Sequence, residues 1–185
     1  MNALTAKAEL SAYWRFVRQM PVVAVEALDE DLLILNRRRR LIICEVKVSI
    51  ADMRHDIEKQ KHDYIYRELG LDKLPGQKPI KDWVPWEIPS MFYFGVPREI
   101  EVKAREVRDE LYPYAGLLSI RGEGTPHFRG HRIAVIYGAK IIHKKPLTEA
   151  QIERVVKAQS ASIANAYSKI ASWSPLVEAY TKVRE

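Results

Sequence analysis

Two carboxylates and one lysine in the N-terminal part of the chain have the types and spacing of a metal-dependent hydrolytic site. Asp31 begins one apolar run, and Glu45 and Lys47 end the next one. Alternate residues of a strand share a face, so Glu45 and Lys47 project together, and antiparallel pairing of the two runs brings Asp31 near Glu45. Burying three such charges is costly unless something coordinates them. A divalent metal ion bound by Asp31 and Glu45 would do so, leaving Lys47 free to orient or deprotonate a water molecule.

The elements that must position these residues follow from hydrophobic periodicity and from breakers. The pattern predicts, in chain order, a helix over 3–19, strands at 22–28, 31–35 and 41–47, a helix over 50–69, a strand at 91–96, a helix over 98–111, strands at 115–120 and 132–137, and a helix from 148 to about 172. Pro175 is expected to break or kink the continuation of the last helix. The first three strands, joined by short turns, form an antiparallel meander. We therefore expect an α/β fold with a mixed central sheet flanked by helices.

Length and composition place the chain among globular proteins with one core. Its 185 residues are 47% hydrophobic and 29% charged, which predicts one domain over 1–185 with a Pro- and Trp-rich insertion at 71–89 and a helical segment at 147–185. A single cysteine, Cys44, excludes an intramolecular disulfide framework and fits a reducing cytoplasm. No apolar run approaches the ~18 residues of a membrane helix. The sequence also contains no Walker A loop, GxGxxG fingerprint or GxSxG elbow.

The spacing Asp31–x13–Glu45–x–Lys47 after an N-terminal helix resembles the PD-(D/E)xK nuclease superfamily. The resemblance implies a restriction-endonuclease-like core of order α-β-β-β-α-β, here with extra strands and a long C-terminal helix. It also implies hydrolysis of phosphodiester bonds with one or two Mg²⁺ (or Mn²⁺) ions. Asp31, Glu45 and the backbone carbonyl of Val46 would then hold the metal, and Lys47 would be the catalytic lysine.

A narrower resemblance lies in the segment at 45–56, which reads Glu-Val-Lys-Val-Ser-Ile-Ala-Asp-Met-Arg-His-Asp. It is similar to the MmcB-like family of DNA-repair proteins, in which a Glu-Ile-Lys strand is followed by a Ser–x–x–Asp-Phe-Arg–x–Asp helix start. The likeness runs from about residue 28 to 170 and includes the stretches 92–97, 115–118 and 138–140. Before the first acidic ligand the family has Gly-Arg-Arg-Ala-Asp, and in residues 27–31 only the final aspartate matches.

Two acidic residues are candidates for a third metal ligand. Glu9 lies on the predicted N-terminal helix, where many superfamily members carry such a residue, and a solvated helix position is its alternative. Glu26 lies on the first predicted strand among valines, which is an unusual place for an idle glutamate. The sequence leaves the choice between Glu9 and Glu26 open.

The predicted helix over 50–69 offers further polar candidates. Residues 52, 56, 60 and 64 are four apart, so on one helix they form a single stripe. Related nucleases place a glutamine, lysine or tyrosine of this helix at the active site, so the resemblance adds Gln60 and Tyr64 to the catalytic candidates. A solvated polar face is the alternative. Ser49 has the type and position of a helix N-cap, and Asp52 three residues later favours the same helix start.

Basic and aromatic residues near these elements are candidates for contacts with nucleic acid. Lys and Arg total 30 against 24 Asp and Glu, which gives a formal net charge of +6 and permits binding to a polyanion. The predicted nucleic-acid-binding residues are Arg37, Arg38, Arg39, Arg40, Ser49, Arg54, Lys59 and Lys61. Trp83 and Trp86 either stack on unpaired bases or anchor the insertion on the core. His127 and His131 lack cysteine or His-Glu-x-x-His support for a zinc site.

These residues predict a metal-dependent deoxyribonuclease that acts in DNA repair or recombination, with Mg²⁺ or Mn²⁺ as cofactor and DNA as partner. The alternative is a catalytically silent DNA-binding module with a nuclease fold. A third reading is a subunit of a repair complex that uses the long C-terminal helix as a docking surface. A second copy of the chain or a repair protein is the expected protein partner.

Overall fold

The computed structural model describes residues 1–71, 88–121 and 132–182, and side chains as far as residue 168. Trp83 and Trp86 of the predicted insertion, and His127 and His131 of the following loop, lie outside the described residues.

Within these ranges, six strands form one mixed sheet in the order β1-β2-β3-β4-β5-β6. Their bounds are β1 (Val22–Ala27), β2 (Glu30–Leu35), β3 (Leu41–Val46), β4 (Met91–Pro97), β5 (Gly116–Ile120) and β6 (Ile133–Tyr137). β1, β2 and β3 form the predicted antiparallel meander, β3, β4 and β5 run parallel, and β6 returns antiparallel to β5. The predicted α/β class and mixed sheet are therefore confirmed.

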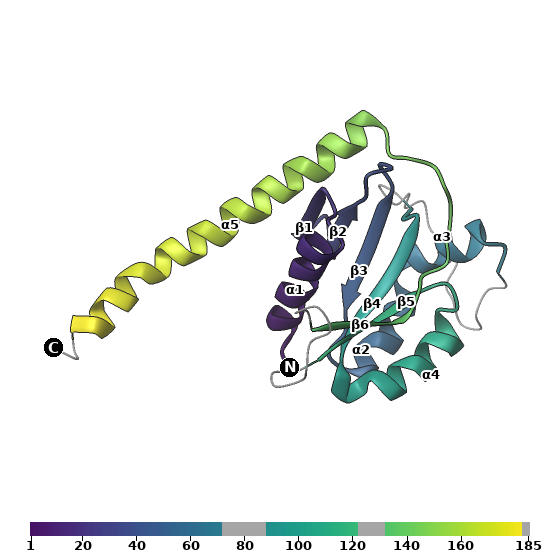
Figure 1. Ribbon diagram of the computed structural model, residues 1–185, viewed down its shortest axis with the longest axis horizontal. Coiled ribbons are helices and arrows are strands. Elements are labelled where there is room, and N and C mark those ends of the chain that lie inside the picture. Colours follow the sequence, from purple (N-terminus) through teal and green to yellow (C-terminus); the bar gives the residue numbers. More distant parts are fainter. Residues whose placement is uncertain (72–87, 122–131, 183–185) are drawn as a thin grey trace.

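Helices cover both faces of this sheet (Figure 1). The helices are α1 (Ala3–Ala12), α2 (Ile50–His55), α3 (Gln60–Glu68), α4 (Glu101–Leu111) and α5 (Glu149–Lys182). Residues of α1 pack into one hydrophobic core, and those of α2, α3 and α4 into the other. No helix in the described ranges is both long and apolar enough to cross a membrane.

β3 is buried along its whole length, because both of its faces are covered. Ile43 packs in the core under α2, α3 and α4, whereas Ile42 and Cys44 pack in the core under α1. This accounts for the continuous apolar run in the sequence, since only a strand covered on both faces needs one. Glu45 and Lys47, at the end of this run, are therefore buried as well.

The prediction of one continuous helix over 50–69 was wrong, because the helix is interrupted between residues 56 and 59. α2 ends at His55, a 3₁₀ turn spans Asp56–Glu58, and Lys59 is extended with ψ 131° before α3 begins at Gln60. Residues 52, 56, 60 and 64 therefore do not form one continuous stripe. No proline or glycine marks the break, so the local sequence gives no signal for it.

Both terminal helices also differ from their predicted bounds. α1 ends at Ala12 and is followed by a π-helical turn over Tyr13–Val17. α5 continues past Pro175 to Lys182, because one proline removes a single helical hydrogen bond and a long helix tolerates that loss. Gln159 Nε2 donates to the carbonyl of Val23 at 3.1 Å, so α5 starts along the edge strand β1 before it extends beyond the sheet (Figure 1).

Candidate active site

Asp31 lies where the pairing of β2 with β3 ends. The last paired residues are Leu32 and Cys44, so Asp31 comes next to Glu45 in this register. Asp31 Oδ2 accepts a hydrogen bond from the backbone amide of Val46 at 2.8 Å, and this side-chain contact follows directly on the strand pairing. The aspartate is thereby held against the segment that carries Glu45, as the meander predicts.

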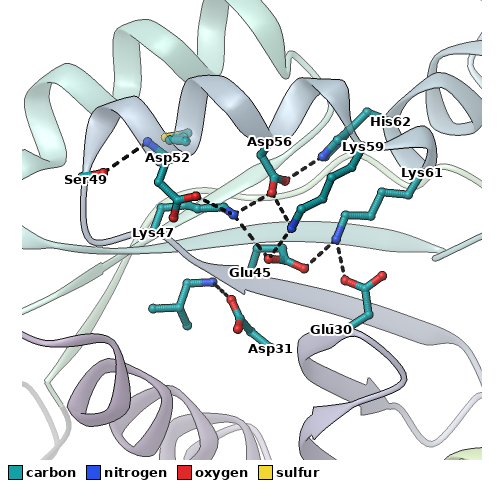
Figure 2. Close-up of polar contacts among 12 residues, drawn as sticks. Glu30, Asp31, Glu45, Lys47, Ser49, Asp52, Asp56, Lys59, Lys61 and His62 are labelled. Atoms are coloured by element: carbon teal, nitrogen blue, oxygen red, sulfur yellow. Dashed lines mark hydrogen bonds and ion pairs between the residues drawn. The ribbon is translucent and has the colours of Figure 1, made fainter. Parts of the chain in front are cut away.

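Glu45 and Lys47 begin a buried cluster of charges on the α2 and α3 side of the sheet (Figure 2). Each residue is only 3% exposed. Lys47 Nζ lies 2.6 Å from Asp56 Oδ1 and 3.5 Å from Glu45 Oε2. Its backbone amide donates to the carbonyl of Gly95 at 3.0 Å, which ties this lysine to the neighbouring strand.

The helix break at Lys59 brings two further lysines to Glu45. Lys61 Nζ lies 2.5 Å from both Glu45 Oε1 and Glu30 Oε2, and it is buried. Lys59 Nζ lies 2.7 Å from Asp56 Oδ1 and 3.4 Å from Glu45 Oε2, and about half of its side chain is exposed. Lys61 was predicted to contact nucleic acid, but the structure buries its ammonium group between two carboxylates.

Asp56 connects the cluster to a buried histidine and tyrosine. His62 Nε2 lies 2.7 Å from Asp56 Oδ2, and His62 Nδ1 lies 2.5 Å from the Tyr114 hydroxyl. Burial lowers the pKa of His62 and raises that of Tyr114, so both side chains are neutral. Tyr114 therefore donates to Nδ1, and the proton on Nε2 is donated to Asp56. Burial opposes ionisation of Asp56, but the hydrogen bond from His62 and the nearby lysines hold its pKa below the usual range.

Glu30 and Glu45 share Lys61 and take up one proton between them. Burial, followed by the hydrogen bond with Glu45, raises the pKa of Glu30 to about 8. Burial also opposes ionisation of Glu45, but the hydrogen bond from Glu30 and the charge of Lys61 hold its pKa well below the usual range. At neutral pH Glu30 is therefore the protonated partner. The three lysines then face the carboxylates of Glu45 and Asp56, and Lys47 Nζ also lies 3.7 Å from Asp52 Oδ1.

A second lysine-bridged group surrounds Asp31. Lys7 Nζ, from α1, lies 2.8 Å from Asp31 Oδ1 and 2.9 Å from Glu26 Oε1. Glu9, the other candidate for a third ligand, pairs instead with Arg132 at 2.9 Å, just before β6. Three strands separate β6 from β2 in the sheet. The structure thus brings Glu26 to Asp31 through Lys7, and it holds Glu9 with Arg132.

The remaining predicted residues lie on α2 and α3 or at the start of α2. The Ser49 hydroxyl accepts from the amide of Asp52 at 3.2 Å, so Ser49 is the N-cap of α2. Arg54 pairs with Glu110 at 2.9 Å. Gln60 begins α3, and the ring of Tyr64 lies under the guanidinium of Arg67.

The four consecutive arginines lie far from this cluster. They form the turn between β2 and β3 (residues 37–40, the arginine turn), whereas Glu45 lies at the other end of β3. At ~3.3 Å per residue, five residues of strand separate Arg40 from Glu45 by about 17 Å. The arginine turn therefore has no direct contact with a phosphate bound at Glu45.

Sequence reasoning missed four participants in the site, which are Lys7, Glu30, Asp56 and His62. Asp56 had a signal, since it closes the 45–56 segment, but it was assigned only to the helical stripe. Glu30 directly precedes Asp31 on the same strand. Lys7 and His62 come from helices on opposite faces of the sheet, and only the packing of those helices shows their position.

The donor groups of the site suit a small, hard cation. Mg²⁺ is commonly held by one or two carboxylates with water molecules completing its shell, and Asp31, Glu45 and the Val46 carbonyl are oxygen donors of that kind. The described residues contain no group of three or more His, Cys, Asp or Glu side chains arranged to hold a metal ion. Ammonium groups of Lys7, Lys59 and Lys61 lie against the same carboxylates. A metal ion would have to displace at least one of them.

Comparison with known proteins gives one structural relative. No family model matches the chain, and no curated protein matches it. A solved structure of a protein of unknown function from Silicibacter pomeroyi matches with a TM-score of 0.51 and 14% sequence identity, over 91% of this chain and 88% of that chain. At this identity the likeness concerns the fold alone.

Proposed function

We propose that this chain is a metal-dependent DNA nuclease of the PD-(D/E)xK type, with Asp31, Glu45, Val46 and Lys47 as its centre. One observation carries the proposal. The Asp31 carboxylate accepts a hydrogen bond from the Val46 amide at the end of β3. Glu45 and Lys47, on either side of Val46, are both buried. Polar groups buried at the end of an otherwise apolar strand are costly, and such sites are frequently functional.

The cation would be held by the carboxylates of Asp31 and Glu45 and by the carbonyl of Val46. Mg²⁺, when bound, would lower the pKa of a water molecule and neutralise charge on the phosphate. Lys47 is a donor held in place by Asp56, and it would orient the attacking water and stabilise charge that develops on the phosphate. Asp56 is in turn fixed by His62, so the pair acts as a support for the catalytic lysine.

Glu30 and Lys61 have a different part in this proposal. They hold Glu45 from the side of α3, and the hydrogen bond from Glu30 together with the charge of Lys61 keeps the pKa of Glu45 low. A cation site needs a carboxylate that is ionised and held in place, because the charged side chains then need little rearrangement during the reaction. By its resemblance to MmcB-like proteins, the enzyme would act in DNA repair within the cytoplasm.

A second candidate function is favoured by the same ion pairs. Glu45, Asp31 and Asp56 each already have a lysine within 2.8 Å. A site neutralised in this way is stable without metal, which suits a DNA-binding module that has kept the fold and lost the reaction.

The two functions are separated by measuring cleavage and metal-linked stability together. Linear, nicked, branched and single-stranded DNA are incubated with and without Mg²⁺ or Mn²⁺, and the melting temperature is recorded over the same metal series. Metal at 100 times its Kd should stabilise the nuclease by about 2.7 kcal/mol. Asp31→Asn should abolish both that gain and cleavage, whereas Lys47→Gln should abolish cleavage alone.

Asp109→Asn is the matched control, because Asp109 is an exposed aspartate on α4. It should leave cleavage and the metal-linked gain unchanged. Wild-type protein that cleaves no form of DNA and gains no stability from either metal would exclude the nuclease and leave the binding module.

A further inference from the structure

A hollow at the opposite end of β3 combines arginine side chains with an apolar floor. Its volume is about 460 Å³, and its rim includes four arginines, which are Arg18, Arg37, Arg38 and Arg40. Met20, Met91 and Ile141 supply the apolar part. Among the described residues, no carboxylate lies in this lining and none forms an ion pair with these four arginines. We call this feature the arginine hollow.

The backbone of the arginine turn is fixed before any ligand arrives. Asn36 Oδ1 accepts from the amides of Arg38 at 2.9 Å and of Arg40 at 3.0 Å. Arg40 Nε donates to the carbonyl of Lys144 at 3.2 Å. A ligand that meets guanidinium groups on a rigid turn loses less conformational entropy than one that must order a loop.

Gln19 follows the end of the helical turn at the edge of this hollow. Its backbone is left-handed, with φ 53°, which costs a residue other than glycine about 1 kcal/mol. Gln19 lines the hollow, and its side-chain oxygen lies 3.5 Å from Arg37 Nη2. The left-handed residue ends the helical turn, and the next amide, that of Met20, donates to the carbonyl of Trp14 at 3.0 Å.

The members of the arginine turn do not all face this hollow. Arg39 is left-handed, with φ 57°, and it lines a second hollow with Glu149 and Glu153 of α5, whereas Arg37 borders both hollows. The turn therefore sends Arg38 and Arg40 to a surface without carboxylates and Arg39 toward acidic residues.

We propose that the arginine hollow binds a nucleotide of single-stranded DNA. Guanidinium groups match phosphate oxygens in geometry and charge, and several of them in one hollow favour a chain of phosphates over a single anion. The floor of two methionines and an isoleucine gives a nucleobase an apolar surface, which is not accessible when the base is paired inside a duplex. A hollow of this size has room for a nucleotide.

This inference deepens the proposed function, because it assigns a substrate class to the nuclease. Arg40, at the rim of the hollow, lies about 17 Å from Glu45 along β3, which equals about five steps of a helical strand at ~3.4 Å each. The arginine hollow would therefore anchor an unpaired strand about five nucleotides from the bond that is cut. Branched, flapped or overhanging DNA provides such a strand, and a blunt duplex does not.

Binding is tested on the full chain in EDTA, where no metal-dependent cleavage occurs, by fluorescence anisotropy with dT₁₅, a blunt 15-base-pair duplex and a duplex with a dT₅ overhang. Single-stranded and overhanging DNA should bind more tightly than the blunt duplex. Arg37→Ser with Arg38→Ser should lower the slope of log K against log salt by about 1.4 for dT₁₅, because each lost phosphate contact contributes ~0.7. Both arginines are exposed, and the Asn36 side chain accepts from the backbone amides of Arg38 and Arg40, which these substitutions retain.

The matched control removes the same charge from the turn before α4 and from α4 itself, with Arg98→Ser and Lys103→Ser, both exposed residues. It should leave the salt slope unchanged. Thymidine monophosphate should displace dT₁₅ at lower concentration than inorganic phosphate, because only the nucleotide has a base for the apolar floor. The proposal would be overturned if inorganic phosphate competed as well as thymidine monophosphate or if the blunt duplex bound as tightly as dT₁₅. It would also be overturned if the two double variants had the same salt slope.

The same data distinguish failure of this inference from failure of the nuclease proposal. A lower slope in Arg37→Ser with Arg38→Ser, in a protein that cleaves no DNA with metal, keeps the arginine hollow and removes the nuclease. If the protein cleaves DNA with metal but the salt slope of this double variant is unchanged, the nuclease proposal stands and the arginine hollow is excluded.

Discussion

Glu30 gives a sharp test of the buried cluster, because it is a carboxylic acid that remains protonated at neutral pH. Its pKa is raised to about 8 by burial and by the hydrogen bond with Glu45. Glu30→Gln replaces the protonated acid with a neutral amide of nearly the same shape. The amide oxygen can still accept from Lys61, and the amide nitrogen can still donate to Glu45. The variant therefore keeps the contacts of the protonated state and loses only the titration.

The direction of the pH effect follows from proton binding. Above pH 4.5 the unfolded chain has lost the Glu30 proton, whereas the native state keeps it to about pH 8. Stability therefore falls as pH rises through this window, by about 1.4 kcal/mol per unit. Below pH 6.5 His62 acts in the opposite sense, because burial lowers its pKa and the native state excludes a proton that the unfolded chain binds. Between pH 6.5 and 8 the effect of Glu30 is no longer opposed by His62. Over this range it lowers the free energy of unfolding by about 2 kcal/mol.

Urea denaturation at half-unit steps from pH 6.5 to 8.5 measures this difference. The variant should be more stable than wild type throughout this range, and the difference between them should widen by about 2 kcal/mol from pH 6.5 to pH 8. The difference should stay constant above that pH. Parallel curves for the two proteins, with no divergence across the window, would show that Glu30 is ionised at neutral pH and would refute the proposed charge state of the cluster.

Three other substitutions test separate parts of the structure. Lys61→Met leaves Glu45 without its closest cation and should cost about 3–5 kcal/mol in urea denaturation, whereas Lys103→Met on exposed α4 should cost almost nothing. Lys7→Met removes the ammonium group that bridges Glu26 and Asp31, so Mg²⁺ should bind several-fold more tightly in a thermal-shift titration, and an unchanged Kd would place the cation elsewhere. Gly116→Ala places a Cβ atom against the Tyr93 ring and 2.8 Å from the backbone nitrogen of Ala139, and it should lower the free energy of unfolding by about 1–3 kcal/mol.

The sequence by itself determined the strands and their connections. Apolar runs bounded by short turns gave the meander of β1, β2 and β3, and the pairing of neighbours along the chain then fixed which residues meet. That is why Asp31 was expected beside Glu45, and the structure places it against the Val46 amide. Ser49 as an N-cap was also readable, because capping depends on residues three apart. All of these features depend on residues close together in the chain, so they can be predicted from the local sequence.

Only the tertiary structure decided how the charges at this site are balanced. The helix break at Lys59 has no local signal, yet it turns Lys59 and Lys61 onto Glu45. Lys7 reaches Asp31 from the opposite face of the sheet, and His62 reaches Asp56 from within the core. These partners are separated by 6 to 24 residues, so no sequence period connects them. They come together because a buried carboxylate must find a cation or a donor, and which one it finds depends on how the helices pack over the sheet.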